Sequence, residues 1–207
     1  MSMFSKAESE RIAAAVAEVE SRTAGELVVA ELGRSDDYAE VRLFATVVVG
    51  LCAGAGVHLV LPAWPVGLVL GAQLAAALVT FILTGLAPVL RWLTPRGRAD
   101  HAVAQAARLS FLEHGVFRTR DRTGVLIFLS ALEHRVVILG DEGIHAQLRD
   151  PGWTELVATL TRAIKEGRAG DGVCEVLGRL GETLARDAPI REDDTNELAN
   201  HVRTRPR

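Results

Sequence analysis

The sequence predicts an α/β protein, a three-layer α/β/α sandwich with a small central sheet, interrupted by a two-helix transmembrane hairpin. Three observations support this prediction. Residues 43–90 contain no Asp, Glu, Lys or Arg, whereas the segments on both sides are rich in charge. Short apolar runs typical of strands, 26–32 and 124–130, flank the uncharged stretch, and helical patterns surround them. Because one strand alone cannot form a sheet, both flanking segments are expected to build one domain together.

The overall charge is nearly balanced. The 207 residues include 23 Lys and Arg against 26 Asp and Glu, a net charge of −3, which gives no indication of nucleic-acid binding. Cys52 lies in the apolar run and Cys174 in a predicted helix, so a disulfide between them is not expected, in keeping with a reducing compartment. The N-terminus lacks a secretory signal pattern, so the internal apolar run is expected to direct membrane insertion.

The segment before the apolar run predicts a helix, a strand and the start of a second helix. Ser5 and Glu8 have the spacing of a capping box, and apolar residues then recur on one helical face. The run 26–32 is rich in β-forming residues. Ser35, Asp36 and Asp37 are expected to cap a helix that continues into the first membrane span.

The apolar run itself predicts two membrane-spanning helices. Residues 43–61 give roughly 28 Å of helix, and residues 64–90 are long enough to span with tilt. Pro62 and Pro65 separate them. The connector has no Lys or Arg, whereas arginines flank both outer ends, so the positive-inside rule places both chain ends in the cytoplasm.

The segment after the run predicts the remainder of the sandwich. Helical spacing over 99–112 is marked by Ala102, Ala106, Leu109 and Leu112, and 124–130 is a strand expected to be covered on both faces. Its hairpin partner is 134–139. One helix is expected to follow Asp150-Pro151-Gly152 and another to begin at Asp171, and the polar residues 188–207 are expected to form a loose tail.

These elements divide the chain into four parts. Residues 1–41 are the first part of the α/β domain, 42–92 the transmembrane hairpin, 93–187 the second part of the domain, and 188–207 the C-terminal tail. The hairpin is therefore interpreted as an anchor inserted within the domain, inside its second helix.

The flanking segments resemble the TPM-domain family, known from a thylakoid-lumen protein of photosystem II repair and from bacterial membrane proteins. The resemblance rests on "TAGELVVAEL", "DDYAE", "FLEHGVFRTRDRTGVLIFLS" and "RVVILGDEGIHAQLRD". The positions that match the family pattern are Gly115, Asp121, Gly124, Val125, Arg135, Ile138, Gly143, Leu148 and Asp150. Asp141, Glu142 and His145 replace the Gly, Tyr and Glu of its Gly-Tyr-Gly-Leu-Glu motif.

The resemblance implies an α/β/α sandwich and several candidate functions. Some family members are described as acid phosphatases, some bind Ca²⁺ at loops near one sheet edge, and many are assembly or repair factors of membrane complexes. With the apolar run, it implies a multi-pass protein of the bacterial inner (plasma) membrane, with cytoplasmic N- and C-termini.

Two groups of residues are candidates for binding. Arg118, Arg120 and Arg122 alternate in one loop and are predicted to meet an anion or a partner protein, with a solvated or lipid-facing loop as the alternative. A divalent cation such as Ca²⁺ prefers oxygen ligands. The residues predicted to supply them are Asp121, Asp141, Glu142 and Asp150, with exposed acidic loops as the alternative.

Three functional hypotheses follow. The first is a non-catalytic cytoplasmic module, tethered to the lipid bilayer, that serves interaction, assembly or repair of membrane proteins. The second is a divalent-metal-dependent phosphatase-like hydrolase, although the sequence has no phosphate-binding Gly-rich loop with Lys and no Ser/His/Asp arrangement. The third is a structural homo-oligomer built by the membrane hairpins, whose Gly50–Gly54 and Gly67–Gly71 pairs allow close helix packing.

Overall fold

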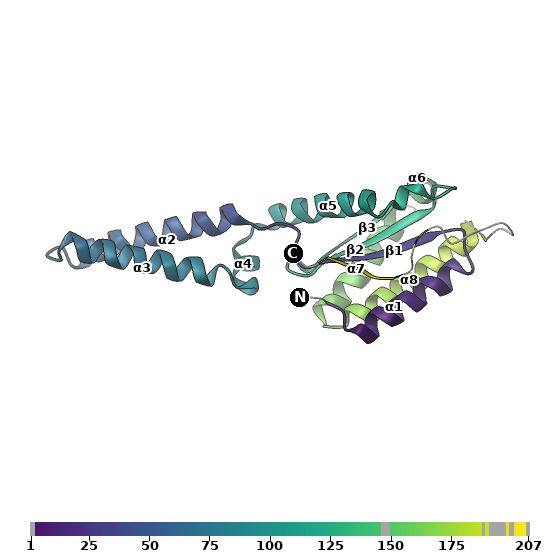
Figure 1. The fold of residues 1–207 in the computed structure, drawn as a ribbon, viewed down its shortest axis with the longest axis horizontal. Helices are drawn as coiled ribbons and strands as arrows, with labels where there is room; N and C mark the ends of the chain where they lie inside the picture. The colour runs from purple at the N-terminus through teal and green to yellow at the C-terminus, as the bar shows by residue number, and fades with distance from the viewer. Residues whose placement is uncertain (1–2, 146–149, 188, 191–197, 199–200, 206–207) are drawn as a thin grey trace. The chain divides into compact units, whose positions relative to one another are not determined.

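A computed structural model of the chain describes residues 3–145, 150–187, 189–190, 198 and 201–205. The chain divides into two compact units, one formed by residues 1–35 with 100–207 and the other by residues 36–99. The first unit is an α/β fold and the second is a helical hairpin (Figure 1). The protein is thus an α/β fold with an inserted helical hairpin.

The sheet of the α/β unit has the strand order β3-β2-β1-β4. Strands β1 (Glu26–Leu32) and β2 (Gly124–Ser130) pair in parallel, although they come from opposite sides of the insertion. Strand β3 (Arg135–Gly140) pairs antiparallel with β2. Strand β4 (Arg203–Arg205) pairs in parallel with the end of β1, so the prediction that 188–207 is a loose tail is wrong for these residues.

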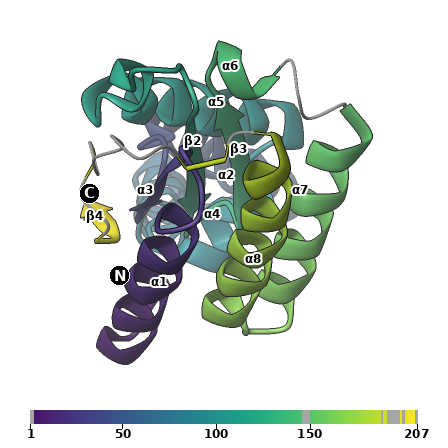
Figure 2. The same ribbon diagram turned by 90° about the vertical axis from the view of Figure 1, so that its right-hand side faces the viewer.

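Helices cover both faces of the sheet, which gives the three predicted layers (Figure 2). On one face lie α1 (Lys6–Glu20), α7 (Asp150–Lys165) and α8 (Ala169–Asp187), with α8 between the other two. On the opposite face lies α5 (Arg96–Glu113). Successive residues of a strand point to opposite faces, so β1 and β2 are buried along their whole lengths.

Helix α1 confirms the predicted capping box. The Ser5 hydroxyl accepts from the Glu8 N–H at 3.2 Å, and the Glu8 carboxylate accepts from the Ser5 N–H at 2.8 Å. These bonds satisfy two of the backbone N–H groups that a helix leaves without partners at its start.

The apolar residues of α5 are divided between a buried and an exposed face. Val103 and Ala107 are buried against the sheet, whereas Leu109 and Leu112 are 49% and 59% exposed. The helix predicted over 99–112 is confirmed, and of the four residues that marked its spacing Ala102 is buried and Ala106 packs against the core.

The hairpin unit contains α2 (Ala39–Val60), α3 (Val66–Leu83) and the short α4 (Ala87–Leu93). Helices α2 and α3 are long and apolar enough to cross a membrane. The second helix ends at Leu83, earlier than the predicted 64–90, because residues 84–86 turn the chain before α4 begins. Gly50 and Gly54 are buried against Ala77 and Gln73 of α3, so this glycine pair serves packing within the hairpin.

Ion pairs join the chain entering the hairpin to the chain leaving it. The Arg98 guanidinium contacts Asp36 at 2.8 Å and also pairs with Glu40. Burial opposes ionisation of Asp36, but hydrogen bonds from Arg98 and two backbone N–H groups lower its pKa. The predicted helix cap at 35–37 is wrong: the residue preceding α2 is Tyr38, whose φ is 50°, and its side chain makes no capping bond.

Candidate functional site

The end of α5 forms a tight turn that leads into β2. The His114 N–H donates to the Ser110 carbonyl oxygen at 3.0 Å, and Gly115 then adopts a φ of 66°. This left-handed conformation suits glycine, which lacks the Cβ that would clash. A single 3₁₀ turn, η1 (Val116–Arg118), follows, and its first residue, Val116, is buried. The turn therefore fixes the position of Arg118.

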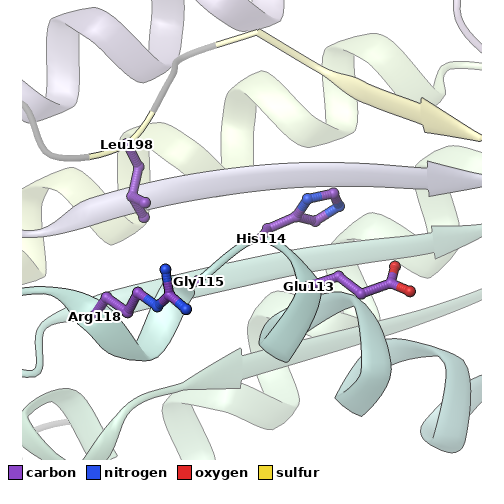
Figure 3. A pocket seen from close by; sticks show the side chains of 5 residues that line it. All are labelled: Glu113, His114, Gly115, Arg118 and Leu198. Carbon is purple, nitrogen blue, oxygen red and sulfur yellow. The ribbon is translucent and has the colours of Figure 1, made fainter.

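A cavity of about 250 Å³ lies at this turn. Figure 3 shows its lining residues, which come from the end of α5, from η1 and from Leu198, beside β1. The Arg118 guanidinium lies near Gly115 and points toward β1, whereas the Glu113 carboxylate points away from Arg118. The Leu198 N–H donates to the Glu26 carboxylate at 3.1 Å, which ties Leu198 to the start of β1.

The three predicted arginines have different surroundings. Arg118 lines the cavity, and Arg120 is exposed on the loop. Arg122 is half-exposed and paired: its Nε lies 3.0 Å from Asp141 Oδ2, and its Nη2 lies 3.5 Å from Glu142. The structure thus brings Arg118 to a cavity, whereas the charge of Arg122 is paired with two carboxylates.

The four predicted metal ligands are not seen as one cluster. Asp141 is buried and paired with Arg122, and Glu142 begins the short helix α6 (Glu142–His145). The side chain of Asp150 lies outside the described residues. Within the described residues, no group of three or more His, Cys, Asp or Glu is arranged to hold a metal ion. The metal site stays a prediction.

A buried polar network at the carboxyl end of the parallel strands was not predicted from the sequence. The Glu133 carboxylate accepts from the Ser35 N–H at 3.0 Å and from the Ser130 hydroxyl. The Ser35 and Ser130 hydroxyls are 2.7 Å apart. Glu133 is 6% exposed and Ser130 is fully buried. Sequence patterns had indicated only a turn here, because Ser35 is distant in the chain from Ser130 and Glu133.

A half-buried carboxylate, Glu20, lies near the opposite end of β1. Burial raises the pKa of Glu20 to about 7, and the neighbouring Glu26 carboxylate adds to the effect. The Leu27 N–H donates to Glu20 Oε1 at 3.0 Å and opposes the shift. Glu20 therefore changes charge near neutral pH, unlike an exposed glutamate.

This pKa predicts a pH dependence of stability. Because the folded-state pKa exceeds the ordinary value of 4.5, the fold favours protonated Glu20, and that stabilisation is lost as pH rises from 4.5 to about 7. Glu20→Gln, which stays neutral, should raise the free energy of unfolding at pH 8 by about 1 to 2 kcal/mol, after allowance for partial exposure. At pH 4 the gain should vanish. Urea unfolding followed by circular dichroism at both pH values tests this, with exposed Glu182→Gln as the control; an equal gain at both would contradict it.

The arrangement of these elements defines the chain as an α/β sandwich with an inserted apolar helical hairpin. Among solved structures, its fold is similar to the NMR structure of the BA42 protein from the psychrophilic bacterium Bizionia argentinensis. The TM-score is 0.62 at 18% sequence identity, covering 98% of this chain and 95% of the other. No family model and no curated protein matches the sequence. At this identity the likeness concerns the fold alone.

Proposed function

We propose that this protein is a membrane-anchored, TPM-like α/β module of the bacterial plasma membrane that contacts other membrane proteins rather than catalysing a reaction. Its hairpin crosses the bilayer, and the α/β unit and both chain ends lie on the cytoplasmic side. The resemblance in sequence motifs and the α/β fold support the TPM-like assignment, and the hairpin supports the anchoring.

The observation that carries the proposal is the exposure of the hairpin's apolar side chains. No residue of α3 is buried, and Gly50 and Gly54 are the only buried residues of α2. Phe44, Leu59 and Leu74 are each 70% exposed or more. A large aliphatic side chain left in water forgoes about 1.5 to 3 kcal/mol relative to burial. A bilayer removes this cost along both helices, and α3 is close to its hydrocarbon thickness of about 30 Å.

Charge at the two ends of the hairpin supports the orientation. The connector between α2 and α3 carries no Lys or Arg, whereas Arg42, Arg91, Arg96 and Arg98 lie at the opposite end. The Arg42 guanidinium lies 4.7 Å from the centroid of the Phe81 ring and so also holds α2 to α3 there. Basic residues near span ends stay on the cytoplasmic side of a membrane.

Single cysteines test the orientation. In a Cys52→Ala, Cys174→Ala background, Ala63→Cys in the connector should react with a membrane-impermeant maleimide in intact cells. Glu182→Cys, exposed on α8, should react only after the membrane is opened. Recovery of the protein in the soluble fraction, or labelling of Glu182→Cys in intact cells, would overturn the proposal.

A further single cysteine in the same background tests for a protein partner. Arg120→Cys carrying a photoactivatable maleimide should crosslink, in native membranes, to one recurrent membrane protein identified by mass spectrometry. Glu182→Cys serves as the matched control and should not capture it. Products that contain only this chain would instead favour the homo-oligomer, and no product would count against a partner at this loop.

No specific observation favours the phosphatase-like alternative. Metal ligands do not gather within the described residues, and the Arg122 charge is already paired with Asp141. Phosphate-ester hydrolysis that a chelator abolishes, and that Asp121→Ala removes, would favour the enzyme over the module.

A further inference from the structure

The cavity at the end of α5 is a feature that the proposed anchoring role leaves without a purpose. It is an open cavity lined by Glu113, His114, Gly115 and Arg118 from one continuous turn and by Leu198 from the C-terminal region (Figure 3). Its volume of about 250 Å³ is slightly below that of sites for drug-sized ligands, about 300 to 1,000 Å³. The space suits a group of the size of one amino-acid residue.

Arg118 supplies a positive charge that the fold does not neutralise. Within the described part of the chain it makes no ion pair, and its guanidinium lies 5.6 Å from the centroid of the Phe117 ring. Arg122 is by contrast paired with Asp141 and Glu142. Arg118, which is exposed, is therefore a cation at the edge of a cavity and available to a ligand. A guanidinium binds a carboxylate through two parallel N–H···O bonds.

The rest of the cavity restricts the anion. The carbonyl end of α5, which carries partial negative charge, terminates at this turn. It disfavours a doubly charged group such as phosphate more than a singly charged one. Leu198 adds an apolar wall beside Arg118. These features match a singly charged carboxylate attached to an apolar group.

We propose that this cavity binds the carboxylate of a small molecule or peptide end that carries an apolar side chain. Arg118 donates to both carboxylate oxygens, and Leu198 packs against the apolar group. Gly115 is needed because a Cβ there would lie 3.3 Å from Arg118 Cδ, and its φ of 66° disfavours other residues. This site is independent of the membrane anchor, since all its residues belong to the α/β unit.

Titration of the full chain in detergent micelles with N-acetyl-leucine tests the site. Saturable shifts of the Arg118 Nε–Hε and Leu198 methyl NMR signals are expected. Because hydrogen bonds to charged groups contribute about 1.5 to 3 kcal/mol, Arg118→Gln should raise the Kd by about 10- to 100-fold. Arg118→Lys, which keeps the charge but lacks the planar fork, should give an intermediate Kd, and Arg108→Gln, on the exposed surface of α5, should leave it unchanged.

Matched ligands separate the possible outcomes. N-acetyl-leucinamide, which lacks the charge, should not bind, and inorganic phosphate should bind more weakly than N-acetyl-leucine. A tetrapeptide ending in leucine that binds more tightly than N-acetyl-leucine would identify a chain end as the source, and equal affinity would identify a small molecule. Equal binding of the amide, tighter binding of phosphate, no saturation, or an unchanged Kd for Arg118→Gln would overturn the site. The cysteine-labelling result would be unaffected, so the two proposals fail separately.

Discussion

Gly124→Ala is expected to destabilise the α/β unit by about 2 to 4 kcal/mol. A Cβ at this position would lie 2.1 Å from the Val116 carbonyl oxygen and 2.8 Å from Val116 Cγ1. Neither the backbone of Gly124 nor Val116 can move easily to relieve this overlap. Gly124 is the first residue of β2 and pairs with Glu26 of β1, while its carbonyl oxygen accepts from the Asp141 N–H at 2.9 Å. Val116 is held in the buried turn η1.

Gly178→Ala provides the matched control. Nothing lies within 4 Å of a Cβ at Gly178, which is inside α8, so alanine should stabilise the helix by about 0.5 to 1 kcal/mol. Reversible urea unfolding in detergent, followed by circular dichroism, should therefore shift in opposite directions for the two variants. A Gly124→Ala protein as stable as wild type would mean that the close approach of η1 to β2 is wrong.

The elements that sequence analysis predicted well are those with strong local signals. The capping box of α1 needs only residues three positions apart. Strand β2 is a continuous apolar run because it is covered on both faces, and β1 was placed beside it because one strand cannot stand alone. The apolar helices α2 and α3 were evident from the charge-free stretch 43–90.

The elements it missed depend on partners distant in the chain. Strand β4, Arg203–Arg205, is polar and three residues long, and only the free edge of β1 makes it a strand. In α5, apolar spacing predicted the helix but not its buried face, which packs Val103 and Ala107 against the sheet. Periodicity identifies a helix more securely than it identifies which of two apolar stripes is buried.

The candidate site was predicted in part for the same reason. Three alternating arginines indicated an anion-binding loop, but only the folded chain distinguishes Arg118 in a cavity from Arg122 paired with Asp141. Leu198, which completes the cavity, lies in a segment interpreted as a tail. Charge spacing suggests what a loop can bind, whereas long-range pairing decides which charges remain available.

Glu133→Ala is expected to destabilise the α/β unit by about 2 to 4 kcal/mol, since each buried donor left without an acceptor costs about 1 to 3 kcal/mol. The Ser35 N–H and the fully buried Ser130 hydroxyl both donate to the Glu133 carboxylate. The same turn joins β1 through two further bonds: the Ala131 N–H donates to the Leu32 carbonyl oxygen at 2.9 Å, and the Leu132 N–H donates to that of Gly33 at 3.0 Å.

Loss of this acceptor should loosen the chain where β1 ends and the hairpin unit begins. Amide hydrogen exchange at Ser35, Ala131 and Leu132 should accelerate in Glu133→Ala more than exchange within β2, because local opening precedes global unfolding. Ser35→Ala removes only a hydroxyl and keeps the backbone bond, so its cost should be near 1 kcal/mol. Exposed Glu182→Ala should change stability by less than about 0.5 kcal/mol. If Glu133→Ala matched Glu182→Ala in both measurements, the network would not hold β1 to the turn after β2.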